Sequence, residues 1–295
     1  GGIFAKGRMS EVYAESSNFT NCSAFRNGGA ISIDQGCHMY ITATHFKDNS
    51  AFSYGGHIYS QTASVNVKHS DFTLGTSKKG GGAMAIFDSE TYMSHTKLVD
   101  NACRDKCGGA VLLSDASRHI CVFSRVILKH NTADQGGGIC VLNKASASIQ
   151  SSDIFYNTAS EGGGVYGSDG VINAQNTTFY NNSASDGGGG ALRYFGCSSE
   201  LINNRLWFNT ASGSTSVGGG GLHSTSSKVN LYANEIYMNR AEAGLGGGIL
   251  FDLQDSVVSF ENNNVSSNVA LTHGGGIAAT ADVNITMRHS KFQAN

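Results

Sequence analysis

The chain has 295 residues with 39 glycines and no proline, and its formal net charge is −2 with only 14% charged residues. With this net charge the chain has no excess of positive charge for binding nucleic acid. No apolar run approaches the roughly 18 residues of a transmembrane helix. A fold in which nearly every backbone N–H donates to a neighbouring strand selects against proline, so the composition favours a dense β structure.

A glycine-rich motif returns along the whole chain at intervals of 26 to 31 residues. The residues that follow its Gly-Gly pairs are Ile3, Ala30, His57, Ala83, Ala110, Ile139, Val165, Ala191, Leu222, Ile249 and Ile277. Most of them open a short apolar run, such as residues 28–33 (GGAISI) and 108–113 (GGAVLL). These runs have the length of β-strands, and the units lack the 3.6-residue period of a helix.

A second motif ends each unit with an asparagine, usually three residues after Phe, Leu, Ile or Val. The asparagines are Asn21, Asn49, Asn101, Asn131, Asn157, Asn182, Asn209, Asn239, Asn268 and Asn295, and only the unit with Gly75 lacks one. Asparagine tolerates the left-handed backbone region, and its amide can bond to the amide of the next unit. We therefore expect a structural asparagine ladder.

The two motifs together predict one turn of a parallel β-solenoid for each unit of about 27 residues. Such a unit holds two or three short strands and tight corners, and each turn stacks on the last at about 4.8 Å. We expect an all-β chain of about ten to eleven coils that forms one domain over residues 1–295. Because neither end resembles a cap, we expect an internal segment of a longer repeat protein.

The motifs resemble the repeats of the polymorphic outer membrane proteins of chlamydiae. The residues that carry the resemblance are 28–33 (GGAISI), 108–113 (GGAVLL), 46–49 (FKDN), 179–182 (FYNN) and 292–295 (FQAN). Similar repeats occur in other cell-surface proteins with a pectin lyase-like parallel β-helix. The resemblance implies a right-handed, single-stranded parallel β-helix and a secreted adhesin.

Aromatic residues occupy one repeat position in four consecutive units: Phe155, Tyr180, Trp207 and Tyr237. They stand two residues before the ladder asparagine, next to an apolar residue that points inward. Side chains alternate along a strand, so we expect these rings to face solvent. Such a row suits binding of a glycan or of a partner protein. The alternative is that the rings only pack against each other from coil to coil.

Acidic residues precede the glycines in three successive units, at Asp134, Glu161 and Asp186. They either hold a cation or form a solvated acidic edge. A carbohydrate-active enzyme, either a polysaccharide lyase or a hydrolase, needs carboxylates or basic partners clustered on one face. The Asp-Asp, Gly-His-Gly and Arg-Ile-Lys signatures of galacturonases are absent, the ten His are scattered, and we expect His57 and His223 to be packed or hydrogen-bonded. We expect a protein that is not an enzyme and has no cofactor, with the carbohydrate-active enzyme as the alternative.

The remaining expectations concern covalent chemistry, location and partners. Cys103 and Cys107 flank one corner and either pair or stay as buried thiols. N-glycosylation sequons occur at Asn18, Asn21, Asn176, Asn181, Asn264 and Asn284. Residues 213–217 (GSTSV) lengthen one corner and predict a protruding loop. We expect an extracellular or cell-surface rod, structural or adhesive, that contacts other copies or neighbouring segments of a surface appendage or filament.

Overall fold

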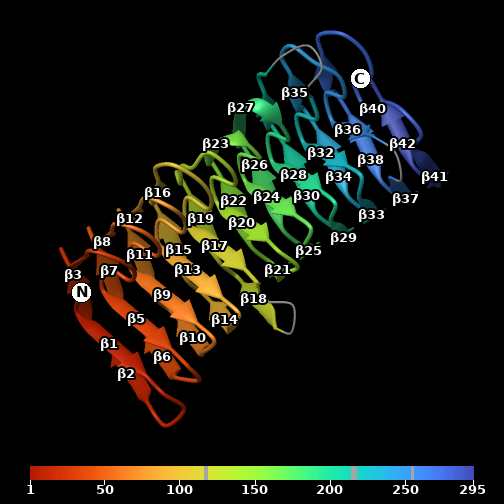
Figure 1. Cartoon of the computed structure of the whole chain (residues 1–295). Coiled ribbons are helices and arrows are strands. Elements are labelled where there is room, and N and C mark those ends of the chain that lie inside the picture. Colours follow the sequence, from red (N-terminus) through yellow and green to blue (C-terminus); the bar gives the residue numbers. More distant parts are fainter. Residues whose placement is uncertain (116–118, 214–217, 254–255) are drawn as a thin grey trace.

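The computed structural model describes residues 1–295 except 116–118, 214–217 and 254–255, so most of the expected loop at 213–217 lies outside the described residues. The described residues form β-strands and corners with no helix, so none of them belongs to a helical membrane span. Three long sheets of eleven strands each run along one axis from the N-terminus to the C-terminus (Figure 1). Within these sheets each strand pairs in parallel with the equivalent strands of the adjacent coils, which is the predicted β-solenoid.

The three long sheets are called sheets A, B and C in the order in which each coil visits them. Sheet A contains β1 (Ile3–Lys6), β5 (Ile31–Asp34), β9 (Ile58–Gln61), β13 (Met84–Phe87), β17 (Val111–Ser114), β20 (Ile139–Leu142), β24 (Val165–Ser168), β28 (Leu192–Phe195), β32 (Leu222–Thr225), β36 (Ile249–Asp252) and β40 (Ile277–Ala279). Sheet B contains β2 (Glu11–Glu15), β6 (His38–Thr42), β10 (Ser64–Lys68), β14 (Glu90–Ser94), β18 (Ile120–Ser124), β21 (Ser146–Gln150), β25 (Val171–Gln175), β29 (Ser198–Ile202), β33 (Lys228–Tyr232), β37 (Val257–Glu261) and β41 (Asn284–Arg288). Sheet C contains β3 (Asn18–Thr20), β7 (His45–Lys47), β11 (Asp71–Thr73), β15 (Lys97–Val99), β19 (Ile127–Lys129), β22 (Asp153–Phe155), β26 (Thr178–Tyr180), β30 (Arg205–Trp207), β34 (Glu235–Tyr237), β38 (Asn264–Ser266) and β42 (Lys291–Gln293).

Two short sheets line the corner where the chain passes from sheet C back to sheet A. They contain β4 (Ser23–Ala24), β8 (Ser50–Ala51), β12 (Thr76–Ser77) and β16 (Ala102–Cys103), and then β23 (Thr158–Glu161), β27 (Ser183–Gly188), β31 (Thr210–Ala211), β35 (Arg240–Ala241) and β39 (Val269–Ala270). Single bridges through Thr132 join the two sheets, so this corner continues from one to the other. We call it the corner edge.

Alternating side chains of the long sheets fill one apolar core along the axis. In sheet C the middle residue of each strand points inward, as Phe46, Phe72 and Leu98 do, and these three side chains have no exposed surface. The ring of Phe46 stacks on those of Phe19 and Phe72 at centroid distances of 4.9 and 4.6 Å. Equivalent side chains of successive coils therefore pack on one another, which explains why each unit has the same residue pattern.

A ladder of asparagine side chains runs inside the corner between sheet C and the corner edge. Asn157 is typical: its Nδ2 donates to Leu128 O at 3.0 Å and to Asn182 Oδ1 at 3.0 Å. Its Oδ1 accepts from the backbone N–H and from Nδ2 of Asn131 at 3.0 and 2.9 Å. Asn49, Asn101, Asn131, Asn157, Asn182, Asn209, Asn239 and Asn268 are all buried in this row, and Asn295 ends it.

Asn21 does not belong to the ladder, and its assignment by sequence was wrong. The equivalent residue is Cys22, whose N–H donates to Asn49 Oδ1 at 2.7 Å. Asn21 lies one residue earlier, is exposed and has a left-handed backbone with φ of 54°. Every described residue just before the ladder row shares this conformation, for example Asp48 and Asp100 at φ of 54° and 56°.

A second polar ladder runs inside the corner between sheets B and C and was not predicted. Its buried members are Thr44, Ser70, Thr96, Ser152, Thr177, Asn204, Asn234 and Asn263. Asn204 Nδ2 donates to Ala174 O at 2.8 Å and to Asn234 Oδ1 at 3.1 Å, which repeats the geometry of the first ladder. A regular spacing in the sequence could have revealed this ladder. Each member stands five residues before the first-ladder position of its own coil.

Candidate functional site

The four aromatic residues predicted as a binding stripe lie side by side on the outer face of sheet C. Phe155, Tyr180, Trp207 and Tyr237 are direct register partners in β22, β26, β30 and β34. The preceding residue of each strand points inward, so alternation turns the four rings outward. The structure thus brings together all four residues of the stripe.

The rings stack on one another along the axis of the β-helix. Centroid distances are 4.5 Å for Phe155 and Tyr180, 5.1 Å for Tyr180 and Trp207, and 5.8 Å for Trp207 and Tyr237. The interplanar angles of these pairs are 7°, 21° and 11°. Lys129 Nζ lies 5.5 Å from the centroid of Phe155 and covers the end of the stack. Most ring faces are therefore covered by neighbours, and the four side chains are half-buried and meet solvent mainly with their edges.

A second row beside the stack carries the more exposed apolar side chains. Tyr156, Phe208 and Met238 are each 46% exposed. They are the left-handed residues before the ladder row, with φ of 54°, 53° and 55°. This conformation breaks the strand alternation and turns a second consecutive side chain outward. Strand alternation does not predict this row, although residues 155–157 (FYN), 207–209 (WFN) and 237–239 (YMN) contain it.

The rings of this second row are rotated out of the stack. Tyr156 makes an angle of 65° with Phe155 and 70° with Tyr180, and Phe208 makes an angle of 51° with Trp207. Their planes are therefore not part of the parallel stack, although the ring of His130 lies 5.4 Å from that of Tyr156 at an angle of 48°. We call Phe155, Tyr156, Tyr180, Trp207, Phe208 and Tyr237 the aromatic platform.

Polar groups interrupt and border the aromatic platform. Asn181 occupies the coil between Tyr156 and Phe208 in the same left-handed row, with φ of 50°, and is partly exposed. On the other side of the stack Arg205 Nε lies 3.0 Å from Glu235 Oε2. Partial burial raises the pKa of the Tyr180 and Tyr237 hydroxyls, so both stay protonated and can donate hydrogen bonds. The surface offers exposed rings next to donors and acceptors.

The predicted acidic residues do not converge on one point. Gln135 and Glu161 are register partners, whereas Asp134 lies one residue before this row. Gln135 Nε2 lies 3.5 Å from Glu161 Oε2, and Asp134 and Asp186 are exposed. The described residues contain no group of three His, Cys, Asp or Glu side chains that could hold a metal ion. The three carboxylates lie along the corner edge.

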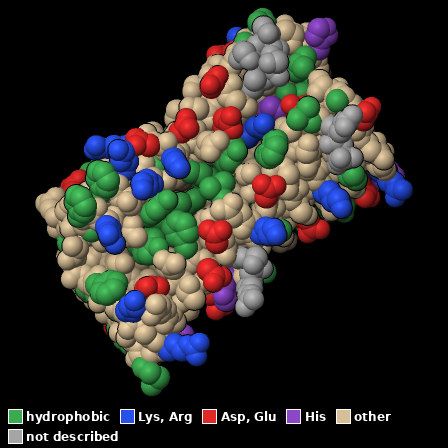
Figure 2. All heavy atoms as spheres, viewed as in Figure 1, with side chains coloured by type: hydrophobic (Ala, Val, Ile, Leu, Met, Phe, Trp, Pro, Cys, Tyr) green, Lys and Arg blue, Asp and Glu red, His purple; other side chains and the backbone are tan. Residues whose placement is uncertain are grey.

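The outer face of sheet A carries a small apolar cluster, visible as the green area in the middle of Figure 2. Its buried members are Ala85, Cys107, Leu112, Cys140 and Tyr166. Farther along the same row the outward residues are Arg193 and His223. The corner loops lie over this face, so it is a second, minor core.

His223 and Arg193 belong to a buried hydrogen-bond network. The ring of His223 is 3% exposed, with Nε2 at 3.0 Å from Asp252 Oδ2 and Nδ1 at 3.2 Å from Gly187 O. Arg193 Nη1 donates to Thr225 Oγ1 at 2.6 Å. The network ties the outer face of sheet A to the loop above it, and His223 is packed and hydrogen-bonded.

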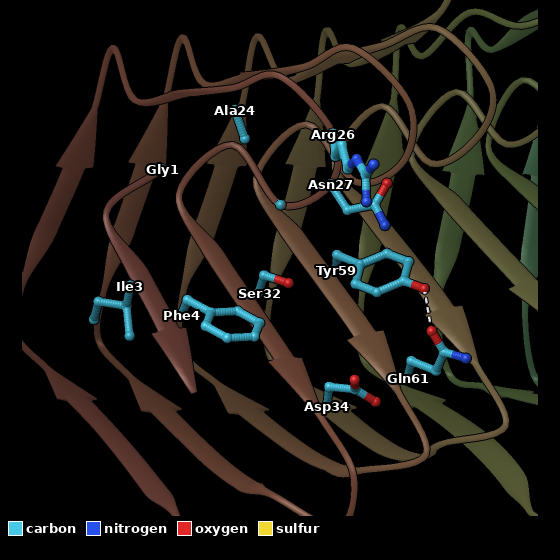
Figure 3. Close-up of a pocket in the computed structure, with 11 residues that line it drawn as sticks. Gly1, Ile3, Phe4, Ala24, Arg26, Asn27, Ser32, Asp34, Tyr59 and Gln61 are labelled. Carbon is cyan, nitrogen blue, oxygen red and sulfur yellow. Dashed lines mark hydrogen bonds between the residues drawn. The ribbon is translucent and has the colours of Figure 1, made fainter. Parts of the chain in front are cut away.

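A hollow of about 390 Å³ lies over the first strands of sheet A. Figure 3 shows Arg26, Asp34 and Tyr59 around it, and Tyr59 Oη donates to Gln61 Oε1 at 2.6 Å. Among its lining residues the hollow has one carboxylate, Asp34. Glycoside hydrolysis in most families uses a pair of carboxylates, so this hollow does not offer that chemistry.

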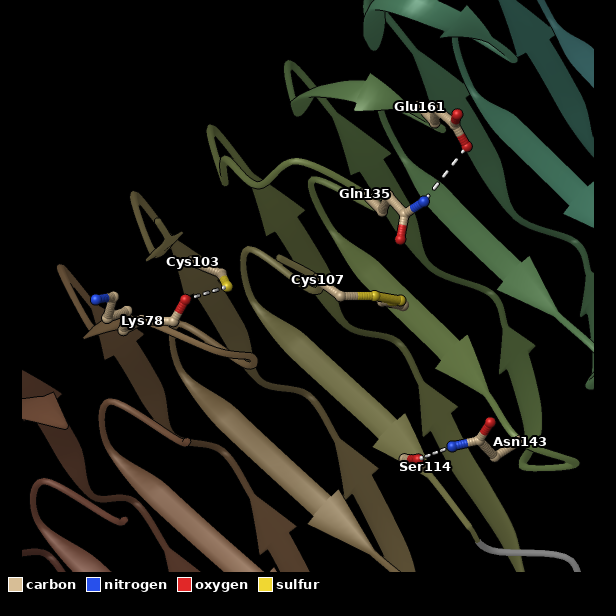
Figure 4. Close-up of a disulfide and its surroundings, with 8 residues drawn as sticks. Lys78, Cys103, Cys107, Ser114, Gln135, Asn143 and Glu161 are labelled. Carbon is tan, nitrogen blue, oxygen red and sulfur yellow. Dashed lines mark hydrogen bonds between the residues drawn. A yellow bond between two sulfur atoms is a disulfide. The ribbon is translucent and has the colours of Figure 1, made fainter. Parts of the chain in front are cut away.

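The structure contains a disulfide at one of the two cysteines that were expected either to pair or to stay as buried thiols. Cys107 pairs with Cys140, a residue of β20 in the next coil, with a Cα–Cα distance of 5.7 Å. Cys103 points elsewhere, as Figure 4 shows, and its Sγ lies 3.7 Å from Lys78 O. Of the two alternatives, the Cys103–Cys107 pair is wrong and Cys103 is a buried thiol, because proximity along the chain does not determine where a side chain points. Cys107 faces the outer side of sheet A. Cys103 belongs to β16, a strand of the corner edge that comes before Cys107 in the chain.

All six sequon asparagines lie on the surface. Asn18, Asn21, Asn176, Asn264 and Asn284 are exposed, and Asn181 is partly exposed. None of them belongs to either ladder once Asn21 is placed outside the first one. Asn181 is the sequon that adjoins the aromatic platform.

The family comparison agrees with this architecture. The model of the right-handed β-helix region matches residues 108–295, well over half of the chain. No curated protein and no solved structure matches the chain. The matched segment includes every residue of the aromatic platform. With its stacked parallel coils and this match, the chain belongs to the right-handed β-helix family.

Proposed function

We propose that this chain is a non-catalytic, adhesive β-helical rod whose aromatic platform binds glycan. The observation that carries the proposal is the arrangement of Tyr156 and Phe208, two exposed rings rotated out of the stack on either side of the Asn181 amide. They lie two coils apart, about 10 Å at the usual strand spacing, which is comparable with the length of a disaccharide.

The chemistry of the platform fits a sugar chain laid along the axis. The face of an aromatic ring packs against the apolar face of a sugar, while its hydroxyls need hydrogen-bond partners. Tyr156 and Phe208 supply the ring faces. Asn181 and the hydroxyls of Tyr180 and Tyr237 supply the polar partners. The stack beside them holds the surface rigid, which lowers the entropic cost of binding.

Three features support a location at the cell surface or in the extracellular space. A disulfide such as Cys107–Cys140 persists in an oxidising compartment. The sequons lie on the surface, where N-glycans are added. The repeats also resemble those of the chlamydial polymorphic outer membrane proteins, which suggests an adhesin.

The experiment is a glycan array probed with purified protein. We expect the wild type to bind a defined set of neutral glycans, and the double variant Tyr156→Ser/Phe208→Ser to lose this binding at least tenfold. Serine fits the left-handed corner, because Ser267 occupies it with φ of 54° in a later coil. Tyr232→Ala is the matched control, since Tyr232 is 48% exposed but lies on sheet B.

Absence of glycan binding by the wild type, or equal binding by the double variant, contradicts the proposal. Right-handed β-helices occur in enzymes as well as in non-enzymatic proteins. The array glycans should therefore also be examined by mass spectrometry after incubation. Shortened or unsaturated products would indicate a polysaccharide lyase or hydrolase in place of a binding protein.

A further inference from the structure

The corner edge carries opposite charges on its two halves. In the first four coils its charged residues are Arg26, Lys78, Lys79, Arg104, Asp105 and Lys106, five cations against one carboxylate. In the next five coils the described residues are Asp134, Glu161, Asp186, Arg240 and Glu242, four carboxylates against one cation. Figure 2 shows the basic residues gathered on the upper edge toward the N-terminal coils and acidic ones farther along.

Most of these charges have no ionic partner within the described part of the chain. Two ion pairs lie on the edge, Lys78 with Asp105 at 3.6 Å and Arg240 with Glu242 at 3.5 Å. The other cations and Asp134 and Asp186 point into solvent. Like charges stacked at about one strand spacing repel one another, and a partner of opposite sign would relieve this repulsion in each half.

The shape of the edge also differs between the halves. The basic half contains a groove of about 550 Å³ whose lining includes Phe25 and Phe52, which are 85% and 53% exposed. Their rings stack at 5.5 Å with an interplanar angle of 7°. The acidic half is lined by small residues at the equivalent positions, such as Ser185 and Ser212. The acidic half, with its small side chains, is therefore narrow enough to fit into the groove that the Phe25 and Phe52 rings flank on the basic half.

We propose that two copies of this chain pair along their corner edges in antiparallel orientation. A two-fold axis near the boundary of the fourth and fifth coils places the basic half of each copy against the acidic half of the other. Arg104 and Lys106 then meet Asp134 of the second copy, and the Phe25–Phe52 groove meets its seventh and eighth coils. Such an interface is isologous and closes on itself, as most homodimer interfaces do.

The size of the edge predicts a weak dimer. The eight coils that face each other span about 34 Å, and the four-residue tips are about 13 Å wide, which gives roughly 450 Å² per copy. Specific interfaces usually bury about 800 Å² per partner, so we expect a dissociation constant in the micromolar range. Because the attraction is largely between exposed charges, the dimer should dissociate near 1 M salt, where the Debye length is about 3 Å.

The test is sedimentation velocity on the whole chain and on two charge-reversed variants. The first variant is Lys79→Glu/Arg104→Glu/Lys106→Glu and the second is Asp134→Lys/Asp186→Lys, all at exposed positions. We expect the wild type to dimerise at low salt at roughly 100 µM, well above the expected dissociation constant. Each variant should be monomeric alone, and an equimolar mixture should form a heterodimer.

Heterodimer formation in the mixture shows that the variants are folded and that their loss of self-association comes from charge, because two misfolded variants would not form a dimer. The control variant Lys68→Glu/Lys228→Glu/Arg288→Glu makes three reversals on sheet B and should still dimerise. A monomeric wild type at low salt overturns the proposal. So does a dimer that survives in either edge variant, or a mixture that stays monomeric. These outcomes are independent of glycan binding, which uses sheet C.

Discussion

His57 fills, inside the β-helix, the space that the missing side chain at Gly75 leaves in the asparagine ladder. The His57 Nδ1 atom lies 2.9 Å from Asn49 Nδ2, and Nε2 lies 3.2 Å from Asn101 Oδ1, so the imidazole bridges the ladder members on either side of the gap. A Cβ at Gly75 would lie 2.5 Å from His57 Nε2. Coils with a ladder asparagine have Ala or Gly, such as Ala83, at the position of His57.

Substitutions at His57 and at Gly75 should affect the free energy of unfolding in a strongly coupled way. We expect His57→Ala to lower the free energy of unfolding by about 2–4 kcal/mol, because it leaves a cavity and unpaired ladder amides. Gly75→Asn should also be destabilising, since the new side chain meets the imidazole. The double variant His57→Ala/Gly75→Asn should be more stable than Gly75→Asn alone. Urea denaturation of all four proteins gives the coupling, and additive losses would show that the two sites are independent.

The buried imidazole should make stability fall in acid. Burial lowers the pKa of His57 from 6.5 to about 3, so between these values the unfolded chain takes up a proton that the folded chain does not. The free energy of unfolding is therefore highest above pH 6.5 and declines toward pH 3, by up to about 1.4 kcal/mol per pH unit from this group. His57→Ala should flatten the profile over this range, whereas the exposed, non-titrating substitution Phe52→Ala should not. An unchanged slope in His57→Ala would contradict the assignment.

The asparagine ladder should contribute to stability at each step. Asn157→Ala removes acceptor and donor atoms and leaves Leu128 O and the Asn131 N–H without their partners. An unpaired buried group costs about 1–3 kcal/mol, so we expect a loss of about 2–4 kcal/mol for Asn157→Ala and for Asn182→Ala. Asn264→Ala, at an exposed strand position, is the control and should cost under about 0.5 kcal/mol. Equal melting temperatures for all three variants would mean that the ladder is energetically silent.

The disulfide should be detectable by peptide mapping. We expect Cys107 and Cys140 to be recovered as a linked peptide pair and Cys103 as a free thiol. The bond closes a loop with a sequence separation of 33 residues, so the variant Cys107→Ser/Cys140→Ser should lose about 2–4 kcal/mol. Cys103→Ser should leave the linked pair intact. A Cys103–Cys107 peptide would show that the coil register at this corner is wrong.

Much of the fold was predictable because every coil must place equivalent residues at equivalent heights. The spacing of Gly-Gly and of Asn gave the number of coils, and the inward residue of each sheet C strand was identified correctly, as with Phe179 and Leu206. The alignment by Gly-Gly pairs slipped by one residue in several coils. Ile139 was aligned with Ala110, whereas the strand register pairs it with Val111. In a run of three glycines the sequence does not show which glycine occupies the turn position, so the alignment can shift by one residue.

The candidate site was predictable only in part, for a conformational reason. Strand alternation correctly placed Phe155 and Trp207 on the outside. Alternation fails at Tyr156 and Phe208, because a left-handed residue turns its side chain outward directly after an outward strand residue. Packing of the rings from coil to coil was the stated alternative to a solvent-facing row, and the rings do stack. The sequence could not decide between the two, since stacking depends on the ring rotamers. Consequently the most exposed rings of the aromatic platform were missing from the predicted stripe.

The most direct test of the glycan-binding platform uses Trp207, the single tryptophan of the chain. Its intrinsic fluorescence should report on the platform alone, because the ring stacks on Tyr180 and contacts Phe208 at 5.1 Å. Titration of the wild type with an array-identified oligosaccharide should give a saturable change in emission, which Tyr156→Ser/Phe208→Ser should abolish and Tyr232→Ala should retain. Unchanged Trp207 emission with an oligosaccharide that demonstrably binds the protein would place the binding site elsewhere and contradict the account.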